Sequence, residues 1–163
     1  MLAQSSSAYF SDKREEQNAE RALLAAAAQV GIQKTRLEKK YLSINRYDFD
    51  PKYGYSCALT LCEGKYRLIV RGNPKAVLSV CSEVFSEGES VPMNEAVRSH
   101  LRANIRHIAG ISERLVAVAT LNLSSPSTGD QRKLCRGMTF LGIFGLSTPV
   151  SASAANAINT CRK

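Results

Sequence analysis

The sequence of 163 residues contains no tryptophan, and only 7% of its residues are aromatic. Single-stranded nucleic-acid sites combine a basic groove with aromatic rings on which bases stack, and the tyrosines here are not interleaved with basic residues in that way. No stretch approaches the roughly 20 apolar residues of a membrane-spanning helix, and the N-terminus has no apolar core of a secretory signal. We therefore expect a soluble domain without direct membrane contact, and nucleic acid is not the partner that the sequence favours.

Metal-binding and nucleophile patterns are also missing. The five cysteines are odd in number and form no C-x-x-C pair, which argues against a disulfide framework or a zinc site and favours free, mostly buried thiols in a reducing cytosol. His100 and His107 are too far apart on one helix to share a metal ion. The sequence has neither a phosphate-binding G-x-x-x-x-G-K-[ST] loop nor a nucleophile elbow.

Positive charge is the main compositional signal. The formal net charge is +8, while the 44% hydrophobic content is ordinary for a globular protein. The length suits one domain with a real core. An excess of positive charge favours an anionic partner. That partner is a nucleotide, a nucleic acid or an acidic lipid surface, and a basic solvated surface explains the charge equally well.

The predicted elements alternate in a way that is typical of an α+β domain. We expect a largely antiparallel, twisted sheet flanked by helices, preceded by a loose segment over residues 1–11. The expected helices are 12–30, 74–82, 94–109 and 151–161, and 33–42 is either a short helix or a connection from helix to strand. The expected strands are 42–49, 55–62, 66–71, 114–123 and 137–146, and residues 84–91 contain a small excursion or hairpin at 86–89. Pro74 is expected in the first turn of its helix and Asn94 at the N-cap of the next.

The junction after the strand 66–71 is the most informative local pattern. The strand ends at the cation Arg71, the backbone breaks at Gly72, and a helix begins beside Pro74. Such a junction offers an anion both a side-chain cation and a helix N-terminus. Taken alone, the same spacing is as well explained by a simple turn.

The wider sequence resembles the nucleotide-binding domain of P-type ATPases. IVRGNPKAVLSVCSEV is similar to the family's V-K-G-A-P-E-x-[IVL]-L-x-x-C segment, and ESVPMNEAV and RLVAVAT are similar to its V-P-[LM] turn with long helix and its L-R-[VC]-[LI]-A-x-A strand. Residues 18–23 stand where the family has G-[DE]-P-T-E-x-A-L, and Phe49 stands where F-[DS]-x-x-R-[KR]-x-M-S begins. The resemblance runs in order through nearly the whole chain. It is closest in character to the calcium, sodium/potassium and magnesium pumps.

The resemblance implies an ATP site made of five residues. Phe49 would stack on the adenine ring, and Glu20 would lie near the adenine edge. Arg71 stands in for the family's pocket lysine, and Gly72 would allow the backbone to approach the ligand closely. Arg114 would contact the phosphates and help to bridge to a neighbouring domain. Each also has an ordinary structural interpretation, such as a core phenylalanine or a surface arginine.

The resemblance further implies a division of labour between domains. The family's phosphorylated aspartate motif D-K-T-G-T is absent, as are its G-D-G-x-N-D motif and every transport helix, so we expect no catalytic residue here. The T-G-D triplet at 128–130 lies in a polar loop and is interpreted as coincidence. Residues 12–146 would form the nucleotide-binding domain, and 147–163 the hinge and the start of a helix returning to a phosphorylation domain.

The expected ligands and partners follow from that division. They are ATP, with Mg²⁺ in the full-length protein, and the phosphorylation and actuator domains of the same cation-transporting pump. The chain would be a cytoplasmic fragment of an integral membrane protein.

Several positions depart from the family pattern. Tyr53-Gly54 replace an arginine–lysine pair, Arg71 replaces a lysine, and residues 147–150 replace D-P-P-R. Two functions therefore stay open. The chain either holds ATP for a cation pump, or keeps the fold as a regulatory or protein-interaction module with weak or no nucleotide binding. Nucleic-acid binding through the positive charge is a third and weaker alternative.

Overall fold

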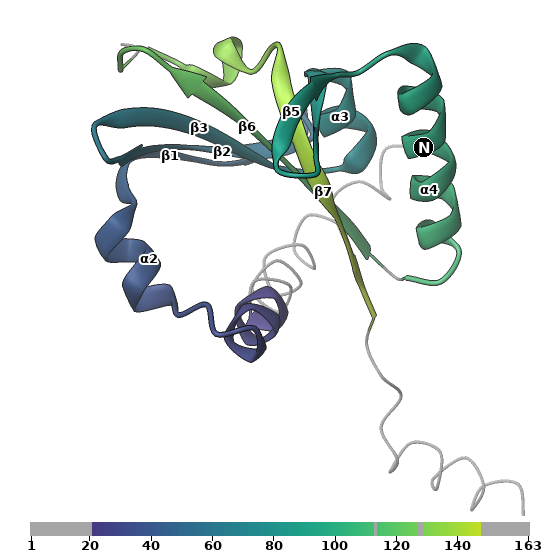
Figure 1. Cartoon of the computed structure of the whole chain (residues 1–163), viewed down its shortest axis with the longest axis horizontal. Helices are drawn as coiled ribbons and strands as arrows, with labels where there is room; N and C mark the ends of the chain where they lie inside the picture. Colours follow the sequence, from purple (N-terminus) through teal and green to yellow (C-terminus); the bar gives the residue numbers. More distant parts are fainter. Residues whose placement is uncertain (1–20, 113, 127–128, 148–163) are drawn as a thin grey trace, which may run out of the picture.

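A seven-stranded sheet forms the centre of the computed structural model, which describes residues 21–112, 114–126 and 129–147 (Figure 1). The strands lie in the order β1-β2-β3-β6-β7-β4-β5. Neighbouring strands are antiparallel except for β4 and β7, which are parallel. Their bounds are β1 Leu42–Asp50, β2 Tyr55–Cys62, β3 Lys65–Gly72, β4 Cys81–Ser86, β5 Glu89–Pro92, β6 Arg114–Leu123 and β7 Met138–Leu146. The prediction of an α+β fold with a largely antiparallel sheet is confirmed.

The helices are α2 (Lys34–Lys40), α3 (Pro74–Ser79), α4 (Glu95–Ala109) and the 3₁₀ helix η1 (Gln131–Leu134). Residues 21–29 are also helical, in agreement with the described part of the predicted 12–30 helix. The caps are those that the sequence predicts, since Pro74 begins α3 and the Asn94 side chain accepts a hydrogen bond of 2.9 Å from the Val97 amide. None of the described helices is long and apolar enough to span a membrane.

Two predicted elements, the helix 74–82 and the loop 124–136, differ in the structure. The predicted helix 74–82 stops at Ser79, because the next residues join the sheet: the Met138 amide donates to the Val80 carbonyl (3.0 Å), and Cys81 pairs with Met138. The long predicted loop 124–136 contains η1, which the sequence analysis did not anticipate. The predicted segment 1–11, the helix 151–161 and most of the hinge 147–163 lie outside the described residues and stay predictions.

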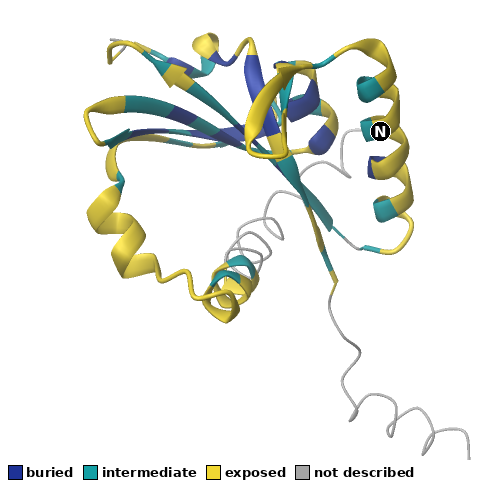
Figure 2. Ribbon diagram, in the orientation of Figure 1, coloured by how far each residue is buried: buried dark blue, intermediate teal, exposed yellow. Residues whose placement is uncertain are grey.

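One face of the sheet forms the core, with α3, α4 and η1 packed on it (Figures 1 and 2). Because side chains alternate across a strand, the buried apolar residues of the central strands point to this face, while the buried hydroxyl residues Ser56, Thr60 and Thr139 alternate with them. Helix α4 lies so close to β7 that a Cβ atom built on Gly145 would be 3.1 Å from Ile108 Cγ2. The fully buried side chains of this core include Leu59, Leu68, Val70, Val77, Ala117, Ala119, Met138 and Phe140. We call the opposite side the outer face.

Candidate functional site

A hollow of about 190 Å³ lies on the outer face where β1, β2 and β3 run side by side. The register brings its walls together, since Arg46 pairs with Ala58, Ala58 pairs with Ile69, and Ser56 pairs with Arg71. Two cations and one carboxylate line it. The lining residues are Arg46, Tyr47, Asp48, Ser56, Cys57, Ala58, Ile69 and Arg71.

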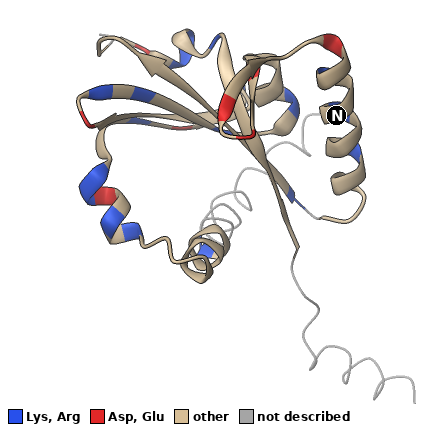
Figure 3. Cartoon of the chain, in the orientation of Figure 1, with Lys and Arg blue, Asp and Glu red and all other residues tan. Residues whose placement is uncertain are grey.

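The hollow lies at the basic end of the sheet. Figure 3 shows basic residues on α2 and on the strands at the β1–β3 end, whereas acidic residues gather at the β4–β5 hairpin. Two arginines against one aspartate leave the lining of the hollow with an excess of positive charge, and such an excess attracts ligands of negative charge. The charge distribution therefore favours an anion at this end of the molecule.

Arg71, predicted from the strand-to-helix junction, forms part of the hollow. Its Nε donates a hydrogen bond of 3.3 Å to Ser56 Oγ, and Ser56 Oγ donates one of 3.2 Å to the Arg71 carbonyl. These bonds tie the base of the guanidinium to the neighbouring strand. A half-buried arginine held in this way is oriented before a ligand arrives, which lowers the entropy cost of binding.

Gly72 does not line the hollow, and its missing side chain has a structural reason. A Cβ atom built there would lie 2.4 Å from the Gly54 carbonyl oxygen and 2.5 Å from Tyr55 Cα. The Asn73 amide also donates to the Gly54 carbonyl at 2.8 Å. The close approach at Gly72 is thus between the chain's own strands β2 and β3.

Phe49 and Arg114 do not line the hollow. Phe49 is half-buried and follows the lining residue Asp48, in a stretch of β1 whose register shifts between Tyr47 and Asp50. Arg114, also half-buried, begins β6 on the same face as Arg71, since Arg71 pairs with Val118 and residues four apart on a strand share a face. The last expected residue, Glu20, lies outside the described residues.

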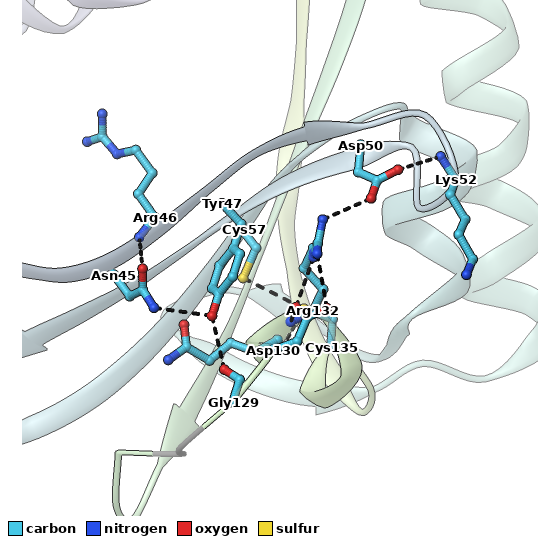
Figure 4. A network of polar contacts seen from close by, with 11 residues as sticks. Asn45, Arg46, Tyr47, Asp50, Lys52, Cys57, Gly129, Asp130, Arg132 and Cys135 are labelled. Carbon is cyan, nitrogen blue, oxygen red and sulfur yellow. Dashed lines mark hydrogen bonds and ion pairs between the residues drawn. The ribbon is translucent and has the colours of Figure 1, made fainter.

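Of the lining residues only Arg71 was predicted from the sequence, and Arg46 and Asp48 are the charged ones that were not. Neither belongs to a motif, and only the pairing of β1 with β2 places them beside Arg71. Figure 4 shows the Arg46 side chain extending away from the polar network on the other side of β1. An alternation of side chains along 42–49 was visible in the sequence, but its register against β2 was not.

Two thiols near the hollow, Cys57 and Cys135, are buried and contact each other. Cys57 and Cys135 are each 2% exposed, and the Cys135 thiol donates to Cys57 Sγ at 4.0 Å. This hydrogen bond together with burial raises the pKa of Cys57 far above its ordinary value, whereas the same hydrogen bond lowers the pKa of Cys135. Three of the four described cysteines are buried, as the sequence predicted. In the described ranges, no three histidine, cysteine, aspartate or glutamate side chains are grouped to hold a metal ion.

Comparison with known proteins identifies the family to which this chain is similar. Residues 3–152 match the family described as P-type ATPase, cytoplasmic domain N. The chain is 26% identical over 145 residues to a calcium-transporting ATPase of Bacillus subtilis (strain 168), covering 88% of this chain and 16% of that protein. It is 29% identical over 146 residues to a putative calcium-transporting ATPase 11, plasma membrane-type, of Arabidopsis thaliana, covering 88% and 14%.

A more distant relative is the sodium/potassium-transporting ATPase subunit alpha of Tetronarce californica, which is 24% identical over 108 residues, covering 61% of this chain and 11% of that protein. The chain therefore spans less than a fifth of the length of these relatives. Because the family match takes in nearly the whole chain, and the fold is the α+β arrangement that the sequence resemblance implied, this chain belongs to the family of the cytoplasmic N domain of P-type ATPases.

Proposed function

We propose that this chain binds ATP on the outer face of its sheet and presents the γ-phosphate to a separate phosphorylation domain of the same cation pump. The observation that carries the proposal is Arg71, a pre-oriented cation in a hollow at the basic end of the sheet. Its family is described as the N domain of P-type ATPases, and relatives are named as calcium-transporting and sodium/potassium-transporting ATPases. Both facts support a nucleotide as the anion.

The arrangement of cations suits an extended ligand. Arg71 and Arg114 lie on the same face of the sheet. Arg71 pairs with Val118, which is four residues from Arg114, so the usual rise of about 3.3 Å per residue separates the two arginines by about 13 Å along the strand direction. The adenine would lie at the hollow beside Phe49, and the phosphates would extend toward Arg114. Guanidinium groups suit phosphate because they donate two parallel hydrogen bonds.

The affinity should be modest. The hollow is small and lies on an open face, so little of the ligand surface would be buried. With few phosphate contacts we expect a Kd of roughly 10–1,000 μM. Mg²⁺ would arrive with ATP in the full-length pump, and the phosphorylation and actuator domains would be partners of this segment on the cytoplasmic side of the membrane.

One observation favours the alternative of a regulatory or interaction module that binds nucleotide weakly or not at all. Position 54, where the family pattern carries a lysine, is a glycine at φ 75°, and a Cβ atom there would lie 2.8 Å from Ala76 Cβ. The turn thus has no room for a side chain at that position, and with Tyr53 before it the chain lacks both cations that the family pattern carries there.

Titration with ATP, followed through backbone amide chemical shifts, separates the two functions. We expect shifts centred on Phe49 and Arg71 and about tenfold weaker binding in Arg71→Gln, the loss of one charge-assisted contact. Arg67→Gln is the matched control, because this substitution removes the same charge from the same strand and the same face. Arg67 lies outside the hollow, where its Nε donates a hydrogen bond of 3.2 Å to Asn122 Oδ1. No response to millimolar ATP would overturn the proposed function and leave the alternative.

A further inference from the structure

We propose that Arg132, on the core face of the sheet, is a positioning residue for the nucleotide site on the outer face. It would hold the turn after Phe49 in the conformation that orients the end of β1. The inference rests on the proposed function. No motif marks this residue, which lies in a segment that the sequence analysis assigned to a polar loop.

Arg132 makes three charge-assisted hydrogen bonds to two carboxylates (Figure 4). Its Nε and Nη2 donate to the two oxygens of Asp130 at 2.9 and 3.0 Å, a bidentate arrangement. Its Nη1 donates to Asp50 Oδ2 at 2.8 Å, across 82 residues of sequence. The bond from Arg132 lowers the pKa of Asp130, so that carboxylate stays ionised and holds the guanidinium in place.

Asp50 is the link to the proposed site, because it follows Phe49 directly. While Oδ2 accepts from Arg132, Oδ1 accepts a hydrogen bond of 2.9 Å from the Lys52 amide. A side-chain acceptor for the amide two residues ahead is the bond that stabilises an Asx turn. One carboxylate therefore connects Arg132 to the backbone of the turn that joins β1 and β2.

Two aromatic rings complete the attachment. The guanidinium carbon of Arg132 lies 5.2 Å from the ring centroids of both Tyr47 and Tyr53, within the range of cation–π attraction. Tyr47 lies in β1 before the register shift, and its hydroxyl donates to the Gly129 carbonyl at 3.0 Å. Tyr53 lies at the end of the turn. Arg132 thus contacts the chain on both sides of Phe49.

The location of these contacts matters because β1 is irregular there. Its pairing with β2 shifts between Tyr47 and Asp50, so the sheet hydrogen bonds alone do not hold Phe49 in register. The arginine and its aspartate partners are only 24–28% exposed, which reduces solvent screening. Without Arg132, we expect the stretch 49–54 to sample other conformations and Phe49 to lose its fixed position beside the lining residue Asp48.

The test compares Arg132→Gln with Arg132→Lys and with Arg136→Gln, an exposed arginine in the same segment that serves as the charge-matched control. For Arg132→Gln we expect faster amide hydrogen exchange over 49–54 and ATP binding about three- to tenfold weaker. Lysine keeps the charge but not the bidentate fork, so it should give an intermediate affinity. The control should bind as wild type does.

A double-mutant cycle distinguishes positioning from general destabilisation. If Arg132 acts through the phenylalanine ring, Arg132→Gln has no further effect on ATP affinity in a Phe49→Ala background. Equal fold-losses in both backgrounds, or unchanged affinity in Arg132→Gln while wild type binds, would overturn the role of Arg132 alone. Wild-type protein that shows no ATP response would overturn the proposed function and this role with it. Should Arg132→Gln not fold, Asp50→Asn tests the same link.

Discussion

The two faces of the sheet are built from the same strands but carry different chemistry. On β3, Leu68 and Val70 are completely buried against the helices, while Arg67, Ile69 and Arg71 alternate with them on the outer face. The core face is filled by close-packed apolar side chains, whereas the outer face leaves a hollow with charged walls. Side-chain alternation therefore lets one strand contribute to folding through every second residue and to the proposed binding through the residues between.

The largest expected effect is a loss of stability at Leu68, which we compare with its neighbour Ile69 on the opposite face of the sheet. Leu68→Ala should lower the free energy of unfolding by about 2–5 kcal/mol, because it leaves a cavity in the core. Ile69→Ala should cost about 1–2 kcal/mol, since Ile69 is only partly buried, but should weaken ATP binding. Urea unfolding and ATP titration measure the two effects. Equal losses of stability for both variants would show that the faces do not differ in this way.

Gly72→Ala tests the contact between β2 and β3 beside the hollow. An added methyl group would press on the Gly54 carbonyl and on Tyr55, so the strands must separate. We expect a loss of about 1–3 kcal/mol, typical of overpacking. Gly110→Ala, at a C-cap with φ −73° and more room, is the control and should change stability by less than about 0.5 kcal/mol. A neutral Gly72→Ala would contradict the close approach.

The thiol of Cys81 provides a pH-dependent test of the core face. Burial raises its pKa from the ordinary 9.0 to about 12, and it donates a hydrogen bond to the Val77 carbonyl at 3.1 Å. Between these pH values the unfolded chain has released the proton while the folded chain retains it. Stability should therefore fall as the pH rises from about 9 to about 12.

Replacing Cys81 by alanine should make the loss of stability between about pH 9 and about pH 12 less steep. Thermal unfolding measured over this pH range tests the expectation. Alkylation gives a second readout: at pH 8, iodoacetamide should modify the half-buried Cys62 well before Cys81, which is 4% exposed. Modification of Cys81 as fast as Cys62 would contradict its burial.

The smallest effect is expected at an exposed ion pair outside both the core and the hollow. Lys40 Nζ lies 3.0 Å from Glu63 Oε1, and both side chains are mostly in solvent. Such pairs are screened by water and salt. We expect Glu63→Gln to leave the midpoint of thermal unfolding and the ATP affinity unchanged, in low and in high salt. A clear loss of stability at low salt would show that α2 is held to the sheet more tightly than its exposure indicates.

Local patterns were sufficient for most of the secondary structure. The alternation over 55–62 and 66–71, the hairpin between them, and the caps at Pro74 and Asn94 all depend on residues close in sequence. The predicted end of the helix 74–82 was wrong, because Cys81 forms a parallel pair with Met138 of β7, more than fifty residues away. Local propensity does not contain such a pairing.

The sequence by itself determined most of the order of elements, the family resemblance and the choice of Arg71 as a candidate site residue, since these depend on residue types at fixed spacings along the chain. Only the tertiary structure decided that Arg46 and Asp48 share a hollow with Arg71, because a register between strands depends on long-range packing. The same holds for Arg132, whose partner Asp50 is 82 residues away. Spacing along a chain says little about which side chains meet when the sheet closes over its core.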